Sequence, residues 1–267
     1  MTKEIREIKP TIIKHDPELN TIPLKDFTAV EMDLFFSIVA KVQEKGDSLI
    51  RLYFSDLKEL SDYKATANKR FVDDIYNTYK KLSTITFGTN SKSGLRRQLF
   101  VMFTKFDING DAEKPYVDIK VNEMAIPLIN NLDRWVRYTL QEFGSLESRY
   151  SKTMYRLLKQ YRTTGKAYYT KETLFELLDV PASYAKKMTN FDKKVLEPII
   201  KELKPIFMRL RVKKIHADKR GRPVIAYEFS FTPEPKDKPE YAPIKPKRKK
   251  DKRDRPPITM YNWLEGK

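Results

Sequence analysis

The sequence predicts an α+β protein of two tandem winged-helix domains, related by an internal repeat and followed by a disordered basic tail. Three observations predict this architecture. The order helix, short strand, two helices and strands occurs twice along the chain. The apolar positions of the two copies agree in register. From residue 233 the chain is rich in Pro and Lys and lacks apolar periodicity up to Pro257, which is typical of disorder.

The first copy opens with a helix that begins at a capping box formed by Thr28 and Glu31. Residues 49–54 are mostly apolar and partly aromatic, as in a short strand. Ser55 is placed to cap the next short helix, and a polar turn leads to an amphipathic helix over 68–82. The apolar faces of these helices consist of Met32, Phe35, Phe36, Ile38, Val39 and Val42, then Leu57 and Leu60, then Phe71, Val72, Ile75, Tyr79 and Leu82.

Strand-like segments complete the first copy. A polar loop and the turn at 109–111 separate them, and a short helix interrupted near Pro127 follows. The predicted strands are 84–88, 98–108 and 116–121.

The second copy repeats this order. Ser145 caps its first helix and Gly165 ends it, residues 166–169 form a strand, and Thr170 begins a short helix that stops near Pro181. The remaining elements are a helix at 186–203 and two strands at 206–216 and 223–232, joined by a short basic turn.

The registers of the two copies support a true repeat. Phe35 and Met154 are offset by 119 residues (154 − 35 = 119), and other core positions agree with that offset to within one residue. The further pairs are Phe36 with Tyr155, Ile38 with Leu157, Val39 with Leu158, Val42 with Tyr161, Leu57 with Phe175, Leu60 with Leu178, Phe71 with Phe191, and Ile75 with Val195.

A helix, a strand, a helix–turn–helix and a β-hairpin together make a winged helix. The second helix of the helix–turn–helix enters the major groove of DNA, and the hairpin, or wing, reaches the flanking backbone. We place the boundaries as an N-terminal arm at 1–20, winged-helix domain 1 at 21–132, a connector at 133–144, winged-helix domain 2 at 145–232, and the tail, with a short aromatic end, at 233–267.

The charge of the chain favours a polyanionic partner. The 267 residues carry a formal net charge of +17, with a pI near 9.7. Nucleic acid is the leading candidate, an anionic membrane surface is the second, and a merely solubilising charge is the alternative. Because there is no Cys, no apolar leader and no run of transmembrane length, we expect a cytoplasmic protein without disulfides.

The predicted helix at 186–203 has one apolar face and carries basic residues just before it and in its first turn. A DNA recognition helix needs both features. A solvated, Lys-rich surface helix is the alternative. Thr189 and Asn190 are good N-cap residues. Pro198 predicts a kink beyond the first two turns, which leaves the DNA-facing end intact.

The predicted DNA-binding residues lie at the starts of helices and in the wings. Arg149, Lys152 and Arg156 are expected to position the DNA backbone, together with the basic wing turn near residue 220. The domain 1 counterpart of that turn would be the loop with Lys92, Arg96 and Arg97. The full set is Lys64, Asn68, Lys69, Arg70, Arg149, Lys152, Arg156, Lys186, Lys187, Thr189, Asn190, Lys193, Lys194, Lys219, Arg220 and Arg222.

The sequence does not indicate catalysis. His15 and His216 lie in unrelated contexts, and His216 suits a surface or phosphate-contacting role better than a metal site. The absence of a His-x-His or His-x-x-x-His pair counts against a nicking rolling-circle replicase, and no phosphate-binding GxxxxGK[ST] loop is present. We therefore predict no catalytic residue, no metal and no cofactor. Trp135 could stack on a base, although packing between domains is the more ordinary role.

Three motifs carry a resemblance to a known family. They are LFFSIVAKV in domain 1, LESRYSKTMYRLLKQYRTTGK at the start of domain 2, and FELLDVPASY with FDKKVLEPIIKEL after it. Over residues 20–232 the chain resembles the replication initiators of iteron-bearing, theta-replicating plasmids, in particular the RepB-like initiators of Gram-positive bacteria. The Glu197-Pro198 pair is also similar to the family.

The resemblance implies a DNA-binding initiator of plasmid replication without catalytic activity. It implies monomers that bind repeated origin sites (iterons), dimers that bind an operator and repress their own gene, and recruitment of the host initiator, helicase and polymerase. We expect the homodimer to form through domain 1. Three alternatives stay open: a transcriptional repressor with two winged helices and no initiator activity, a nicking replicase, and a basic structural or RNA-binding protein.

Overall fold

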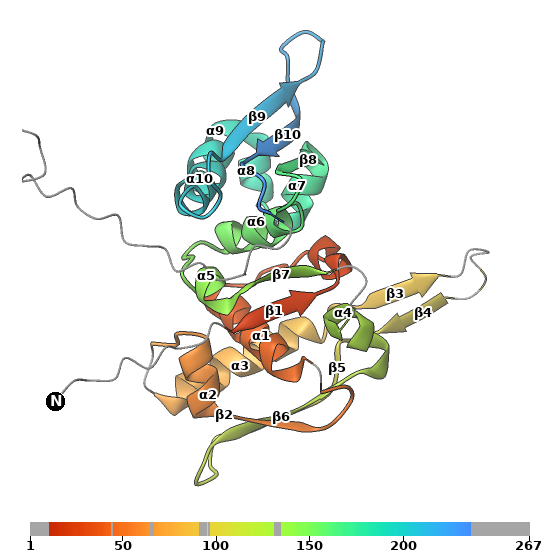
Figure 1. Ribbon diagram of the computed structural model, residues 1–267, viewed down its shortest axis with the longest axis vertical. Helices are drawn as coiled ribbons and strands as arrows, with labels where there is room; N and C mark the ends of the chain where they lie inside the picture. The colour runs from red at the N-terminus through yellow and green to blue at the C-terminus, as the bar shows by residue number, and fades with distance from the viewer. Residues whose placement is uncertain are drawn as a thin grey trace, which may run out of the picture.

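The computed structural model describes residues 11–43, 45–64, 67–90, 95, 97–130 and 135–235. Two winged-helix domains lie one above the other along the long axis, with a small sheet and helix α6 between them (Figure 1). The predicted α+β class with two winged-helix domains is therefore confirmed. The tail from residue 236 and the loop residues Lys92 and Arg96 lie outside the described residues. Within the described ranges no helix is long and apolar enough to cross a membrane.

Domain 1 is a helix–turn–helix packed against a three-stranded antiparallel sheet of order β2-β6-β5. The predicted capping box is present: the Thr28 hydroxyl accepts from the Glu31 amide, and the Glu31 carboxylate accepts from the Thr28 amide. The elements are α1 (Ala29–Val42), β2 (Ile50–Tyr53), α2 (Phe54–Leu60), α3 (Asn68–Leu82), β5 (Phe103–Asn109) and β6 (Tyr116–Val121).

Domain 2 has the same sheet topology, since its strands follow the order β8-β10-β9. In both sheets the last strand lies between the first and the second, so the internal repeat extends to strand order. The elements are α6 (Arg149–Lys159), β8 (Lys166–Thr170), α7 (Lys171–Leu177), α8 (Ala182–Lys186), α9 (Met188–Phe191), a π-helical turn (Asp192–Leu196), α10 (Glu197–Leu203), β9 (Arg211–His216) and β10 (Val224–Ser230).

The helix predicted over 186–203 runs from Met188 to Leu203 and contains a π turn directly before Glu197 and Pro198. The Glu197 amide donates to the Asp192 carbonyl, five residues back rather than four. Pro198, which has no amide to donate, follows directly in the first turn of α10. Lys187, and not Thr189 or Asn190, is the N-cap residue.

The π turn accommodates one extra residue relative to α3. The first two buried positions of α3, Phe71 and Ile75, precede Phe191 and Val195 by 120 residues. The last two, Thr78 and Leu82, precede their counterparts by 121 residues, and these counterparts are Ile199 and Leu203. The core face is therefore kept although the helix is longer by one residue.

Several predicted boundaries are wrong for local reasons. The strand predicted over 98–108 is two strands, β4 (Arg97–Phe100) and β5, and β4 pairs with β3 (Phe87–Asn90) in a separate hairpin. The topological counterpart of the β9–β10 wing is therefore β5–β6, not the predicted loop near Lys92. The N-cap residue of α2 is Tyr53 rather than Ser55, that of α6 is Ser148 rather than Ser145, and residues 206–210 form turns before β9.

A two-stranded sheet lies between the domains. β1 (Ile12–His15), in the predicted arm, pairs antiparallel with β7 (Val136–Thr139), in the predicted connector. These segments therefore form ordered structure that packs on α1 and α6 (Figure 1). The short elements around them are η1 (Pro17–Thr21), η2 (Glu123–Ala125), α4 (Ile126–Asn130) and α5 (Leu140–Gly144).

Candidate nucleic-acid interface

The N-terminal half of the domain 2 recognition helix presents cations to solvent. Lys186 ends α8, Lys187 follows in extended backbone, and both are exposed. Lys193 and Lys194 are exposed in the π turn, whereas Phe191 and Val195 behind them are fully buried. Thr189 is exposed and Asn190 half-exposed in the first turn. This surface therefore has the amphipathic arrangement that the sequence predicted.

The domain 2 wing is joined to this helix by an ion pair. Lys214 Nζ on β9 lies 2.7 Å from both carboxylate oxygens of Asp192, in the π turn. Because this pair ties strand to helix, wing and recognition helix are held as one unit. Sequence patterns did not reveal this contact, because Lys214 and Asp192 lie on separate elements.

The loop of the domain 2 wing is short, exposed and basic. Lys219, Arg220 and Arg222 are all exposed at its tip. Gly221 has a φ of +81°, which allows the tight turn, and the Arg222 amide donates to the Lys219 carbonyl. His216 Nδ1 donates to the Arg222 carbonyl at 2.6 Å, so His216 supports the turn.

The predicted DNA-binding residues of domain 1 are more engaged within the protein. Asn68 accepts a hydrogen bond from Lys58 Nζ, and Lys64 lies 3.8 Å from the Asp62 carboxylate. Lys69 and Arg70 are exposed in the first turn of α3. Among the described residues of the predicted set, domain 1 therefore offers DNA fewer cations without an acidic neighbour than domain 2 does.

Two predicted backbone contacts are wrong, because their side chains are buried between the domains. Lys152 is 0% exposed, its Nζ lies 2.6 Å from Asp33 Oδ1, and it donates to the Phe143 carbonyl. Arg156 is 2% exposed, donates to the Leu19 carbonyl and lies over the Phe36 ring, 4.7 Å from its centroid. DNA could reach these cations only if α6 left α1.

Burial governs the ionisation of this junction. It raises the pKa of Asp33 to about 6, an effect that neighbouring Lys152 opposes, and it lowers the pKa of Lys152 and of Arg156. His15 on β1 is also buried, and burial together with Arg156 lowers its pKa to about 3. His15 and His216 lie in unrelated parts of the protein, as predicted, and each makes contacts within the protein. Among the described residues no group of three or more His, Asp or Glu side chains could hold a metal ion.

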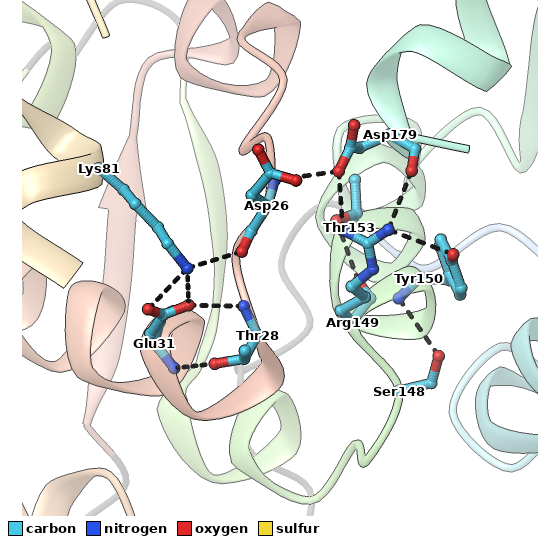
Figure 2. Close-up of polar contacts among 9 residues, drawn as sticks. All are labelled: Asp26, Thr28, Glu31, Lys81, Ser148, Arg149, Tyr150, Thr153 and Asp179. Carbon is cyan, nitrogen blue, oxygen red and sulfur yellow. Dashed lines mark hydrogen bonds and ion pairs between the residues drawn. The ribbon is translucent and has the colours of Figure 1, made fainter. Parts of the chain in front are cut away.

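Arg149 belongs to a polar network that joins the domains (Figure 2). Its guanidinium contacts the Asp179 carboxylate at 2.8 Å and donates to the Asp179 carbonyl and the Tyr150 hydroxyl. The same carboxylate accepts from the Asp26 amide, and the Asp26 carbonyl accepts from Lys81 Nζ at the end of α3. Arg149 therefore helps to join domain 2 to the segment before α1, and its predicted contact with the DNA backbone stays a prediction.

Known proteins resemble this chain along both domains. The profile of the family described as "Initiator Replication protein, WH1" matches residues 12–159, and that described as "Initiator Rep protein, WH2" matches residues 170–231. A probable replication protein rep of Bifidobacterium longum (strain NCC 2705) is 29% identical over 242 residues, which cover 90% of this chain and 79% of that protein. A crystal structure of Pi initiator protein in complex with iteron DNA has the same fold, with a TM-score of 0.63 and 18% identity over 85% of this chain and 98% of that one.

Proposed function

Because the chain belongs to the initiator replication protein family and is a DNA-binding initiator of plasmid replication, we propose that it binds repeated origin sites mainly through domain 2. The Pi initiator, which shares its fold, was solved in complex with iteron DNA, and iterons are the sites proposed here. Recruitment of the host initiator, helicase and polymerase is the proposed next step, in the cytoplasm.

The arrangement of the domain 2 helix and wing carries this proposal. Four lysines stand exposed at the start of the recognition helix, and three cations stand exposed on the wing that an ion pair joins to it. The helix cations and Asn190 are suited to the major groove, and the wing cations to flanking phosphates. The proposed contact residues are Lys186, Lys187, Thr189, Asn190, Lys193, Lys194, Lys219, Arg220 and Arg222, with Lys64, Asn68, Lys69 and Arg70 as a weaker set in domain 1.

A direct test compares variants of one helix. Asn190→Ala and Lys193→Ala should each weaken binding to the origin repeats by about 5- to 150-fold, because a good base contact contributes about 1–3 kcal/mol. Lys201→Ala is the matched control, since Lys201 is exposed at the far end of the same helix. Equal affinity and an unchanged footprint in both test variants would remove the recognition-helix assignment.

We propose that domain 1 also forms the dimer that represses the chain's own gene. The β3–β4 hairpin projects from domain 1 (Figure 1), and Leu99 on it is 78% exposed. Leu99→Arg should shift the protein toward monomer in sedimentation without weakening monomer binding to a single repeat. An unchanged dimer fraction would place the dimer contact elsewhere.

Two alternatives remain testable in the same system. A repressor without initiator activity would bind the operator but fail to support replication of an origin plasmid in trans. A nicking replicase would cleave supercoiled origin DNA with a divalent metal. The initiator proposed here supports replication in trans and leaves the supercoiled DNA uncut.

A further inference from the structure

The two wing loops lie at opposite ends of the long axis of the molecule (Figure 1). The β9–β10 loop of domain 2 exposes the three basic residues already described and one acid, Asp218. The β5–β6 loop of domain 1 exposes two acids, Asp111 and Glu113, and one cation, Lys114. One molecule therefore has a basic end and an acidic end.

The acids at the domain 1 end stand on a turn that the backbone fixes. The Asp111 and Ala112 amides donate to the Asn109 side-chain oxygen at 3.1 and 3.0 Å, so this turn holds both acids in place. Within the described ranges of the chain, no cation forms an ion pair with the carboxylate of Asp111 or of Glu113. These carboxylates are therefore available to a cation from outside the molecule.

A hollow beside the β5–β6 loop adds a place for such a cation. It has a volume of about 490 Å³, and Glu113 and Lys114 line it together with Tyr53, which is 41% exposed. The Phe54 amide donates to the Pro115 carbonyl at 3.0 Å, so the loop is held to the start of α2 at the hollow. A carboxylate and an aromatic side chain are both groups that a guanidinium binds.

We propose that the basic wing loop of one copy docks on the acidic end of the next copy when two copies bind adjacent direct repeats of origin DNA. Direct repeats hold the copies in one orientation, so the unlike ends meet between them. Opposite charges favour this meeting, whereas two basic ends or two acidic ends would repel each other. A loop with three cations can contact the flanking phosphates and the neighbouring copy together. The inference rests on the proposed binding of origin repeats and adds a partner, a second copy of the chain.

The contact is expected to be weak in solution and to become effective on DNA. Exposed ion pairs each contribute little, and salt screens them further. Binding to adjacent repeats holds two copies at a high effective concentration, so a weak contact suffices to couple them. The contact should therefore appear as cooperative binding to DNA, and not as a dimer of the free protein.

Gel-shift titrations on DNA with one repeat and with two adjacent direct repeats measure this coupling. The parent chain should bind a repeat about fivefold more tightly beside an occupied repeat than alone, and this factor should decrease at high salt. Glu113→Lys should reduce the factor to about one while keeping the affinity for a lone repeat. Adding Lys219→Glu to this variant exchanges the charges and should restore most of the factor. Each variant is compared with its own lone-repeat affinity, because Lys219→Glu also removes a proposed phosphate contact.

Two controls separate the contact from other effects. Glu123→Lys changes another exposed acid of domain 1, just before α4, and should keep the factor of the parent chain. Moving the repeats apart by about five base pairs, half a turn of the duplex, places the copies on opposite faces and should abolish the factor. Equal factors in the parent and in Glu113→Lys, or no recovery in the double variant, would overturn the inference. A parent chain that binds a lone repeat without cooperativity would overturn the inference alone, whereas one that binds no repeat would also overturn the proposed function.

Discussion

Domain 1 and domain 2 share one strand order but carry opposite charges at two equivalent places. Asp73 and Asp74 on α3 stand 120 residues before Lys193 and Lys194, on the same part of the helix. The β5–β6 loop holds Asp111, Glu113 and a single lysine, whereas the β9–β10 loop holds three cations and one acidic residue, Asp218. The same scaffold therefore supports a strongly basic reading surface in domain 2 and a nearly neutral one in domain 1.

The first helices of the two domains show a different relation. Asp33 of α1 and Lys152 of α6 occupy equivalent repeat positions, 119 residues apart, and they pair with each other. Arg156 likewise takes the position of Ser37. The domains thus pack about equivalent helices, as in an isologous dimer, but with complementary rather than identical side chains. Charge divergence between the repeats therefore places complementary side chains at their junction and unlike charges on their surfaces.

The largest expected effect concerns this junction. Asp33→Ala should lower the free energy of unfolding by about 3 kcal/mol, because it leaves the Lys152 charge buried without a partner. The double variant Asp33→Ala with Lys152→Met should recover most of the loss. Thermal and denaturant unfolding measure both. Equal destabilisation in single and double variants would show that packing, and not the ion pair, is what Asp33 contributes.

A charge exchange between the two recognition helices is expected to have the next largest effect. Lys193→Asp with Lys194→Asp should weaken binding to origin repeats by about 100-fold, because two cations that face the DNA become anions. Asp73→Lys, at an exposed position of α3, should strengthen binding by a smaller factor. If both exchanges change affinity equally, the two domains contribute alike and the comparison fails.

A titration of His15 should affect stability by a smaller amount. Its pKa is about 3 in the folded protein and near 6.5 when unfolded, so the unfolded chain takes up the proton first as pH falls. Stability is therefore complete above pH 6.5 and decreases toward pH 3, by about 2 kcal/mol at pH 5. Asp33, with its raised pKa, acts in the opposite direction, so the measured quantity is the difference between wild type and His15→Asn. A difference that does not vary between pH 5 and 8 would contradict the assignment.

The smallest effect should come from the wings. Arg220→Ala should reduce the salt slope of repeat binding by roughly 0.9 and the affinity by a fewfold, because it removes one phosphate contact. Glu113→Ala in the opposite wing should change neither quantity if that wing does not contact DNA. Gel-shift titrations over a range of salt concentrations distinguish the two wings.

Features encoded locally were predictable from the sequence. The Thr28–Glu31 capping box, the buried stripe of α3 and the basic start of the second recognition helix depend on residues within a few turns of each other. The β1–β7 pairing was missed because each strand has four residues and its partner is more than 100 positions away. Lys152 and Arg156 appeared to be solvent-facing because they lie off the apolar stripe of α6, yet that side is covered by α1. A helical wheel cannot reveal a second domain.

The unlike wings give the molecule a direction. Because domain 2 is basic and domain 1 is nearly neutral, the protein cannot bind a duplex in the reverse orientation without replacing strong contacts by weak ones. On a row of direct repeats every copy would therefore face the same way, as in a head-to-tail stack. The last copy in such a row would present one particular domain to the neighbouring DNA. Inverted repeats would instead place like domains against each other, so the order of sites in the origin would decide which surface is left outermost.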